Sequence, residues 1–251
     1  MAAVTIAGRE LGAAIFDTDG VVTDTARVHF TAWKDVFDAV LREHAGTGAF
    51  DEFTRDDYLR YVDGVPRYDG VQRFLDSRDI ELSYGDPSDG PEQETVCGVG
   101  NRKNEHFLHR LREEGAPAYD GTVSLLRWLR GHAVPLAVIS ASRNAGEVLA
   151  SAGVDELFDT LVDGREAERL GLAGKPDPAV FLEAAERLGV APPHAMVVED
   201  AQAGVRAARA GGFGLVVGVD RDGQRQQLLA EGADVVVDDL AELLDGASAS
   251  S

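Results

Sequence analysis

Two aspartates, Asp17 and Asp19, follow directly on a short apolar run at residues 13–16. The apolar run predicts a buried strand that ends where the carboxylates begin. Side chains alternate along an extended backbone, so Asp17 and Asp19 point the same way, and Gly20 then lets the chain turn. Like charges this close need a cation or a shared proton. The pair indicates an aspartate nucleophile beside a proton-moving aspartate, with a divalent metal holding both. By itself, the pair equally fits an acidic turn after a strand.

Three further polar groups follow other predicted strands or loops. Ser140 ends an apolar run, Lys175 lies in a Gly-Lys-Pro-Asp-Pro loop, and Glu199 and Asp200 end a third run. Each has a simpler explanation: a helix cap, an exposed loop lysine, and an acidic first turn favoured by the helix dipole. Ligands of parallel α/β sheets bind at the carboxyl ends of the strands, where all these groups fall. Their coincidence at one edge favours a single site.

The elements that must position these groups alternate between strand and helix. We expect an α/β fold, with a doubly wound Rossmann-like parallel sheet as its core. The apolar runs predict strands at 13–16, 135–140, 161–162, 195–200, 214–219 and 233–237. Helical spacing predicts helices at 145–152, 177–188 and 203–210.

Residues 26–112 contain no convincing buried strand and predict a helical cap inserted after the first strand. A helix capped by Asp24 or Thr25 opens this region. Further helical stretches and a polar loop follow it, and the chain end is expected to be frayed. We therefore expect a catalytic core domain of residues 1–25 and 113–251 and a helical cap domain of residues 26–112. The helical stretches lie near 56–62, 69–77 and 101–113, the loop at 83–98, and the frayed end at 246–251.

The charge of the chain bears on its partners. The 251 residues carry a formal net charge of −20, which disfavours binding to nucleic acid or anionic membranes. No apolar run approaches the ~20 residues of a membrane span, and the N-terminus lacks a secretory signal pattern. The lone Cys97 fits a reducing compartment, so we expect a cytoplasmic protein. A phosphate substrate would need a locally basic site, and only three of the 24 basic residues are lysines.

The sequence resembles the haloacid dehalogenase superfamily and, within it, the β-phosphoglucomutase-like subgroup. Four core motifs carry the resemblance: Asp17-Thr-Asp-Gly-Val21, Ser140 at a strand end, Lys175 before a proline, and Glu199-Asp200. It covers most of the chain. Other matching stretches lie at 22–33, 140–144 and 199–204 in the core and at 64–67 and 101–104 in the cap.

The resemblance implies roles for the core residues. Asp17 becomes an aspartyl phosphate, and Asp19 serves as general acid and base. Mg²⁺ is the implied cofactor, held by Asp17, the backbone carbonyl of Asp19, Glu199 and Asp200. Lys175 and Ser140 hold the phosphoryl oxygens, in a stretch that continues through Ala141, Ser142, Arg143 and Asn144.

The resemblance also implies a second anion site that involves the cap. Arg67, in the stretch that begins at Gly64, would bind the phosphate that is not transferred, together with Ser142, Arg143 and Asn144. His29 and Lys103 resemble residues that contact Asp19 on lid closure, although His29 equally fits a helix surface. Thr25 lies at the implied hinge. The chain departs from the subgroup at Asp63 and Arg143, which replace lysines, at Pro66, which replaces a serine, and in the loop 83–98, which has no counterpart.

The implied activity is that of an isomerase. It converts β-D-glucose 1-phosphate to glucose 6-phosphate through an aspartyl-phosphate enzyme and bound β-glucose 1,6-bisphosphate. A Mg²⁺-dependent sugar-phosphate phosphatase is the alternative, and a non-catalytic sugar-phosphate-binding protein is a third. Asp19 disfavours a dehalogenase, because a halide needs no proton, and Arg67 cannot form the Schiff base of a phosphonatase. We expect a monomer that binds a small-molecule sugar phosphate and neither nucleic acid nor membrane.

Overall fold

The structure is a computed structural model that describes residues 3–249, with only the backbone described at Glu114. The chain divides into two compact units. The core unit comprises Met1–Asp24 and Ala116–Ser251, and the helical unit comprises Thr25–Gly115. The boundaries expected from the sequence, after residues 25 and 112, fall close to these divisions.

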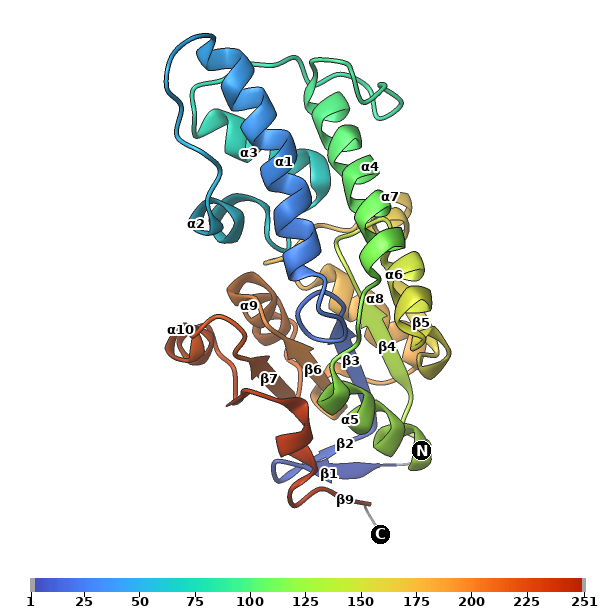
Figure 1. Ribbon diagram of the computed structural model, residues 1–251. Helices are drawn as coiled ribbons and strands as arrows, with labels where there is room; N and C mark the ends of the chain where they lie inside the picture. The colour runs from blue at the N-terminus through green and yellow to red at the C-terminus, as the bar shows by residue number, and fades with distance from the viewer. Residues whose placement is uncertain (1–2, 250–251) are drawn as a thin grey trace. The chain divides into compact units, whose positions relative to one another are not determined.

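The core unit is built on a parallel sheet of six strands in the order β5-β4-β3-β6-β7-β8 (Figure 1). The predicted α/β fold with a doubly wound parallel sheet is confirmed. Each predicted strand is present, with ends that shift by one or two residues. The strands are β3 (Ala13–Asp17), β4 (Leu136–Ile139), β5 (Thr160–Val162), β6 (Ala195–Glu199), β7 (Leu215–Val219) and β8 (Val235–Val237).

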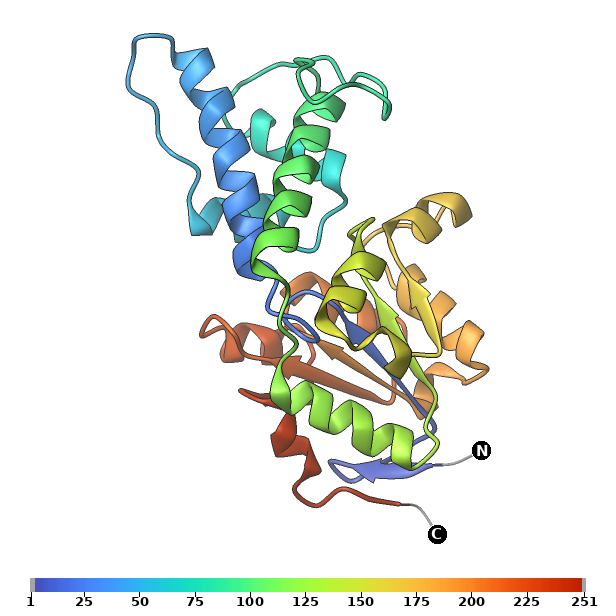
Figure 2. The same ribbon diagram turned by 45° about the vertical axis from the view of Figure 1, so that its right-hand side comes forward.

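Both faces of this sheet are covered, because successive side chains of each strand point to opposite sides. In β3, Ala14 and Phe16 pack on one face with side chains of α5 (Asp120–Gly131). Ala13 and Ile15 pack on the other with those of α8 (Ala179–Leu188), as Figure 2 shows for the helices flanking the sheet. The remaining core helices are α6 (Ala145–Ala152), α7 (Gly164–Leu170), α9 (Gln202–Ala210) and α10 (Arg225–Ala230), with short 3₁₀ turns at Asp155–Leu157, Pro192–His194 and Leu240–Leu244.

A second, three-stranded sheet lies at the end of the core unit and corrects two expectations. It has the order β2-β1-β9, with β1 (Val4–Ile6), β2 (Arg9–Leu11) and β9 (Ser248–Ala249) paired antiparallel. The sequence predicted no strand before residue 13 and a frayed end at 246–251. The end is instead held by pairing to β1, a contact between opposite ends of the chain. Residues 250–251 lie outside the described residues.

The helical unit contains α1 (Ala26–Ala45), α2 (Arg55–Asp57), a π-helical turn (Tyr58–Val62), α3 (Arg67–Asp76) and α4 (Val96–Glu114). Helices α1 and α4 lie side by side (Figures 1 and 2). The predicted loop 83–98 is wrong at its end. Thr95 caps α4 by accepting a hydrogen bond from Gly98 N–H, so residues 96–98 are helical.

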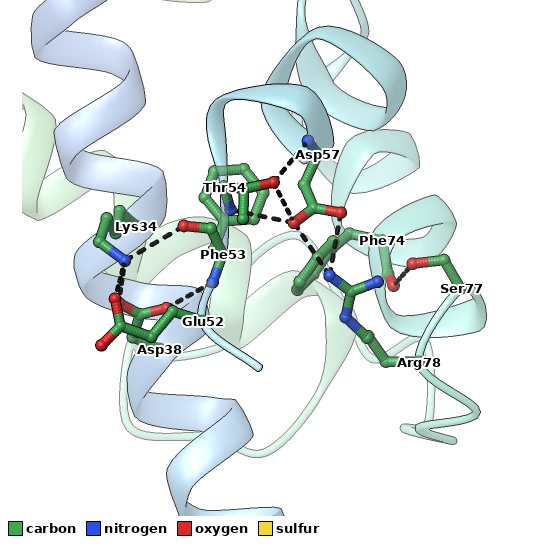
Figure 3. Close-up of polar contacts among 9 residues, drawn as sticks. All are labelled: Lys34, Asp38, Glu52, Phe53, Thr54, Asp57, Phe74, Ser77 and Arg78. Carbon is green, nitrogen blue, oxygen red and sulfur yellow. Dashed lines mark hydrogen bonds and ion pairs between the residues drawn. The ribbon is translucent and has the colours of Figure 1, made fainter. Parts of the chain in front are cut away.

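Polar contacts fix the segment that leads from α1 to α2 (Figure 3). Asp38 on α1 accepts a hydrogen bond from Phe53 N–H at 2.8 Å, and Lys34 contacts Glu52 at 2.8 Å. Thr54 and Asp57 then form a capping box. Phe53 is buried in the aromatic core of the unit. The capped start of α2 is thereby held against α1.

Among the helices of residues 3–249, none has the length and apolar character needed to cross a membrane.

Candidate active site

The loop after β3 brings the two motif aspartates to the carboxyl edge of the sheet. Asp17 is the last residue of β3 and is 6% exposed. The Thr18 carbonyl accepts hydrogen bonds from the N–H groups of Val22 and Thr23, both at 2.9 Å, which closes a tight loop. Gly20 allows this turn because it adopts a φ of +81°, a conformation that costs glycine little.

Lys175 connects the aspartate of β3 to the acidic end of β6. Its Nζ donates hydrogen bonds to Asp17 Oδ1 and to Glu199 Oε1. All three side chains are buried. Burial lowers the pKa of the Lys175 ammonium, but the two carboxylates outweigh this and raise its pKa above the usual value. Lys175 therefore remains a fixed positive charge beside Asp17.

The carboxylates at this edge outnumber the ammonium. Burial raises the pKa of Asp17 well above its usual value, Lys175 opposes this, and Glu199 and Asp19 add to it. One ammonium thus faces Asp17, Asp19 and Glu199. The local electrostatics favour a further cation.

Glu199 and Asp200 are placed by two close-packed glycines. Glu199 is fully buried, and its Oε2 accepts a hydrogen bond from Ala201 N–H at 2.9 Å. A Cβ added at Gly204 would lie 1.8 Å from Glu199 Oε1, and one added at Gly20 would lie 1.8 Å from Asp200 Oδ2. The Asp200 carboxylate therefore rests against the backbone of the loop after β3.

Ser140 extends the site along the sheet edge. It follows β4, is buried, and its hydroxyl lies 3.5 Å from Asp19 Oδ2. Its Oγ also accepts a hydrogen bond from Ser142 N–H at 3.0 Å, and Asn144 N–H donates to Ser142 Oγ at 3.2 Å. Arg143 instead pairs with Glu168 on α7 at 3.2 Å, with both side chains exposed. Ala141 lies between the two serines in this turn.

The sequence did not reveal Arg221, which supports the loop from the far side. Arg221 follows β7, donates a hydrogen bond from Nε to Gly20 O at 2.8 Å, and stacks 3.6 Å from the Tyr119 ring centroid. Tyr119 donates a hydrogen bond to Asp24 at 3.3 Å. Burial, and next the charge of Asp24, raise the pKa of Tyr119 to about 12, so it stays a neutral donor. The only sequence signal was the position of Arg221 just past a predicted strand.

The donor set suits a hard divalent cation. Asp17, Glu199, Asp200 and the Asp19 carbonyl offer only oxygen, the ligand that Mg²⁺ prefers. The Asp200 carboxylate already packs against Gly20, the residue next to the Asp19 carbonyl. In residues 3–249 no group of three or more His, Cys, Asp or Glu side chains is arranged around one point as a metal site. The residues fit Mg²⁺ in donor type and in excess negative charge.

The remaining predicted residues belong to the helical unit. Thr25 is the buried N-cap residue of α1, and Gly64 adopts a φ of +65° before α3. His29 and Lys103 meet each other: Lys103 Nζ lies 2.7 Å from His29 Nδ1. Arg67 donates hydrogen bonds to two asparagines of α4.

Fold and site together define a class. A doubly wound parallel sheet carries a buried aspartate, a lysine and further carboxylates at its carboxyl edge, which is the arrangement of an α/β enzyme. A family model described as haloacid dehalogenase-like hydrolase matches residues 11–212, and the chain belongs to this family.

Individual relatives narrow the comparison. A β-phosphoglucomutase of Mycobacterium bovis is 49% identical over 240 residues, which cover 92% of this chain and 91% of the relative. A validoxylamine A 7'-phosphate phosphatase of Streptomyces hygroscopicus subsp. limoneus is 30% identical, with 92% of this chain and 94% of the relative covered. The crystal structure of a β-phosphoglucomutase from Clostridium difficile matches with a TM-score of 0.75 and 27% identity, covering 93% of each chain. The chain is an enzyme, either an isomerase or a phosphatase.

Proposed function

We propose that the chain is a β-phosphoglucomutase, which converts β-D-glucose 1-phosphate to glucose 6-phosphate. The observation that carries this proposal is the contact of Lys175 with both Asp17 and Glu199 at the carboxyl edge of the sheet. It places a potential nucleophile beside a fixed positive charge that can bind a phosphoryl group. The extensive identity to a relative named β-phosphoglucomutase supports the choice of substrate.

The chemistry proceeds in two transfers that use the same residues. Phosphorylated Asp17 passes its phosphoryl group to the 6-oxygen of β-glucose 1-phosphate, and Asp19 takes the proton of that hydroxyl. The resulting 1,6-bisphosphate binds again in the reverse orientation. Asp17 then attacks the phosphorus on the 1-oxygen, the bond to the sugar breaks, and Asp19 returns the proton to the departing oxygen. Glucose 6-phosphate leaves, and Asp17 is phosphorylated again.

Other groups stabilise the charge that moves during each transfer. Lys175 and the Ser140 hydroxyl bind the phosphoryl oxygens, and the polar turn at 140–144 lies next to them. Mg²⁺, bound by Asp17, Asp19 carbonyl oxygen, Glu199 and Asp200, would supply further neutralisation of the phosphoryl group. In the helical unit, Arg67 binds the phosphate that is not transferred.

The test is an assay with β-glucose 1-phosphate, Mg²⁺ and a trace of β-glucose 1,6-bisphosphate. A mutase forms glucose 6-phosphate with little free phosphate, and omission of the bisphosphate slows it. Addition of EDTA stops it. Release of phosphate in step with substrate loss would refute the mutase and establish a phosphatase. The relative that is named a phosphatase and shares 30% identity makes this the second candidate.

A further inference from the structure

The loop before α4 is the part of the chain that the proposed function leaves without a role. It lies in the helical unit and ends where Thr95 caps α4. Its own contacts hold it closed, because Asp89 Oδ2 accepts hydrogen bonds from Thr95 Oγ1 at 2.7 Å and from Asp86 N–H at 3.1 Å. Thr95 in turn accepts one from Gly98 N–H at 2.9 Å. The loop is therefore fixed to the first turn of α4.

One side chain of α4, Asn101, connects this loop to Arg67. Asn101 Nδ2 donates hydrogen bonds to the carbonyl of Pro87 at 3.1 Å and to that of Asp89 at 2.8 Å. Asn101 Oδ1 accepts hydrogen bonds from Tyr68 OH at 2.9 Å and from Arg67 Nη1 at 3.3 Å. The four partners dictate the amide orientation, since two carbonyls can only accept and a guanidinium can only donate.

Arg67 has a second partner on the same helix. Its Nη2 donates a hydrogen bond to Asn104 Oδ1 at 2.7 Å, so both terminal nitrogens are held by residues of α4. The backbone of α4 also approaches Arg67 and Tyr68 closely, because a Cβ added at Gly100 would lie 3.1 Å from Arg67 Cδ and 2.8 Å from Tyr68 Cδ1. A long side chain with many rotamers is thereby restricted in orientation.

We propose that the loop at 83–95 acts through Asn101 as a positioning device for Arg67. The carbonyls of Pro87 and Asp89 set the plane of the Asn101 amide, and this amide with Asn104 sets the plane of the guanidinium. The inference rests on the proposed role of Arg67 as the ligand of the phosphate that is not transferred. A guanidinium held in one plane binds a phosphate more tightly, because less rotational freedom is lost on binding. Asn101 is then a positioning residue that need not touch the substrate.

The first experiment measures the order of Arg67 itself. Arginine Nε–H signals of ¹⁵N-labelled protein are recorded, and the Arg67 signal is identified by its loss in Arg67→Ala. We expect it to be rigid in the wild type and mobile in Asn101→Ala, with Gln72→Ala as the control on exposed α3 surface. A signal that stays rigid in Asn101→Ala overturns the proposal, whatever reaction the enzyme catalyses.

The second experiment asks whether Asn101 acts through Arg67. Asn101→Ala should lower conversion of β-glucose 1-phosphate about tenfold, the scale of one hydrogen bond to a charged group, and leave hydrolysis of acetyl phosphate unchanged. In an Arg67→Ala background the same change should cost nothing further. Additive losses would mean that Asn101 only supports the fold and would overturn the proposal. If Arg67→Ala alone leaves conversion intact, the proposed role of Arg67 fails, and the Nε–H measurement still decides whether the loop orders this side chain.

The third experiment isolates the loop. Asp89→Ala breaks the tie to Thr95 without touching Arg67, and Ser88→Ala removes a hydroxyl that bonds only to Asp86 among the contacts of the loop. The Arg67 signal should gain mobility in Asp89→Ala and keep its order in Ser88→Ala. Unchanged order in Asp89→Ala would overturn the part of the proposal that concerns the loop.

Discussion

Asp17 is distinguished from the other aspartates by its position at the end of β3 and by its contact with Lys175. Asp17→Asn keeps the size of the side chain and removes the negative charge that attacks phosphorus. We expect turnover to fall by roughly a thousandfold or more, the scale seen when a covalent nucleophile is lost. The measurement is glucose 6-phosphate formation together with trapping of phosphorylated protein.

The matched control for this change is Asp69→Asn, an exposed aspartate on α3. It should leave turnover and the circular dichroism spectrum unchanged. A well-folded Asp17→Asn protein with wild-type phosphorylation would rule out Asp17 as the nucleophile.

Gly204 tests how tightly Glu199 is packed. Gly204→Ala gains up to about 1 kcal/mol of helix propensity, but the new Cβ overlaps the buried Glu199 carboxylate, and overpacking costs about 1–3 kcal/mol. We therefore expect a net loss of stability and of activity. In a chain of this size, each kcal/mol lowers the midpoint of thermal unfolding by about 2–4 °C.

Gly131→Ala is the comparison, because an added Cβ there meets nothing within 4 Å at the end of α5. This variant should be unchanged or slightly more stable. An equal gain in both variants would show that Glu199 yields without cost.

At this scale, the sequence revealed groups that end predicted strands. Asp17 and Glu199 could be placed because an apolar run leads directly into each of them. Lys175 has no such local pattern and was placed by its resemblance to a family motif. Arg221 could not be found, because its contact with Gly20 joins residues about 200 positions apart and depends on the order of strands in the sheet.

Among the elements, α2 depends on one buried carboxylate (Figure 3). Burial raises the pKa of Asp57, but hydrogen bonds from Thr54 and the charge of Arg78 outweigh this and hold its pKa below the usual value. Such a group stabilises the fold above the ordinary carboxylate pKa of about 4, and this stabilisation is lost as pH falls below it. We expect Asp57→Asn to weaken the helical unit at pH 6 and to lose less stability than the wild type between pH 4 and 3.

Tryptophan fluorescence can follow this unit by itself. The chain has two tryptophans, and Trp33 is buried in the helical unit, so Trp128→Phe leaves a single reporter there. Asp56→Asn, at the exposed neighbouring position, serves as the control. Parallel acid profiles for wild type and Asp57→Asn would contradict the expected linkage.

The limits of sequence reasoning for elements have a physical cause. The strands of the parallel sheet were predictable because each is an apolar run of a few residues. The pairing of β9 with β1 was not, because Ser248 and Ala249 gain their structure from a partner at the other end of the chain. Helix α7 has no fully buried residue, so it presents no apolar periodicity to detect. The loop before α4 was predicted as polar, but its ties to Asn101 depend on backbone carbonyls, which no side-chain pattern encodes.

For the whole molecule, the central difficulty is a formal net charge of −20 in an enzyme proposed to bind two phosphates. At physiological salt, charges separated by more than about 8 Å are largely screened, so nearby cations decide binding. Lys175 is the cation at the nucleophile in the core unit, and Arg67 is the proposed cation for the other phosphate. Both proposed activities need Asp17, Asp19 and Lys175, so variants of these residues cannot distinguish a mutase from a phosphatase.

Arg67→Ala can make this distinction, because only a mutase must hold a phosphate at the far end of the sugar and bind the bisphosphate in both orientations. Loss of a charged partner of a bound dianion typically costs roughly 2–5 kcal/mol, about 30-fold or more in rate or affinity. We expect conversion of β-glucose 1-phosphate to fall by at least that factor. Phosphate release from acetyl phosphate should persist, since this small donor needs only the end of the site at Asp17. Arg73→Ala, on the exposed side of the same helix, should change neither activity. Equal loss of both activities in a folded Arg67→Ala protein would assign Arg67 a structural role, and loss of neither would favour the phosphatase.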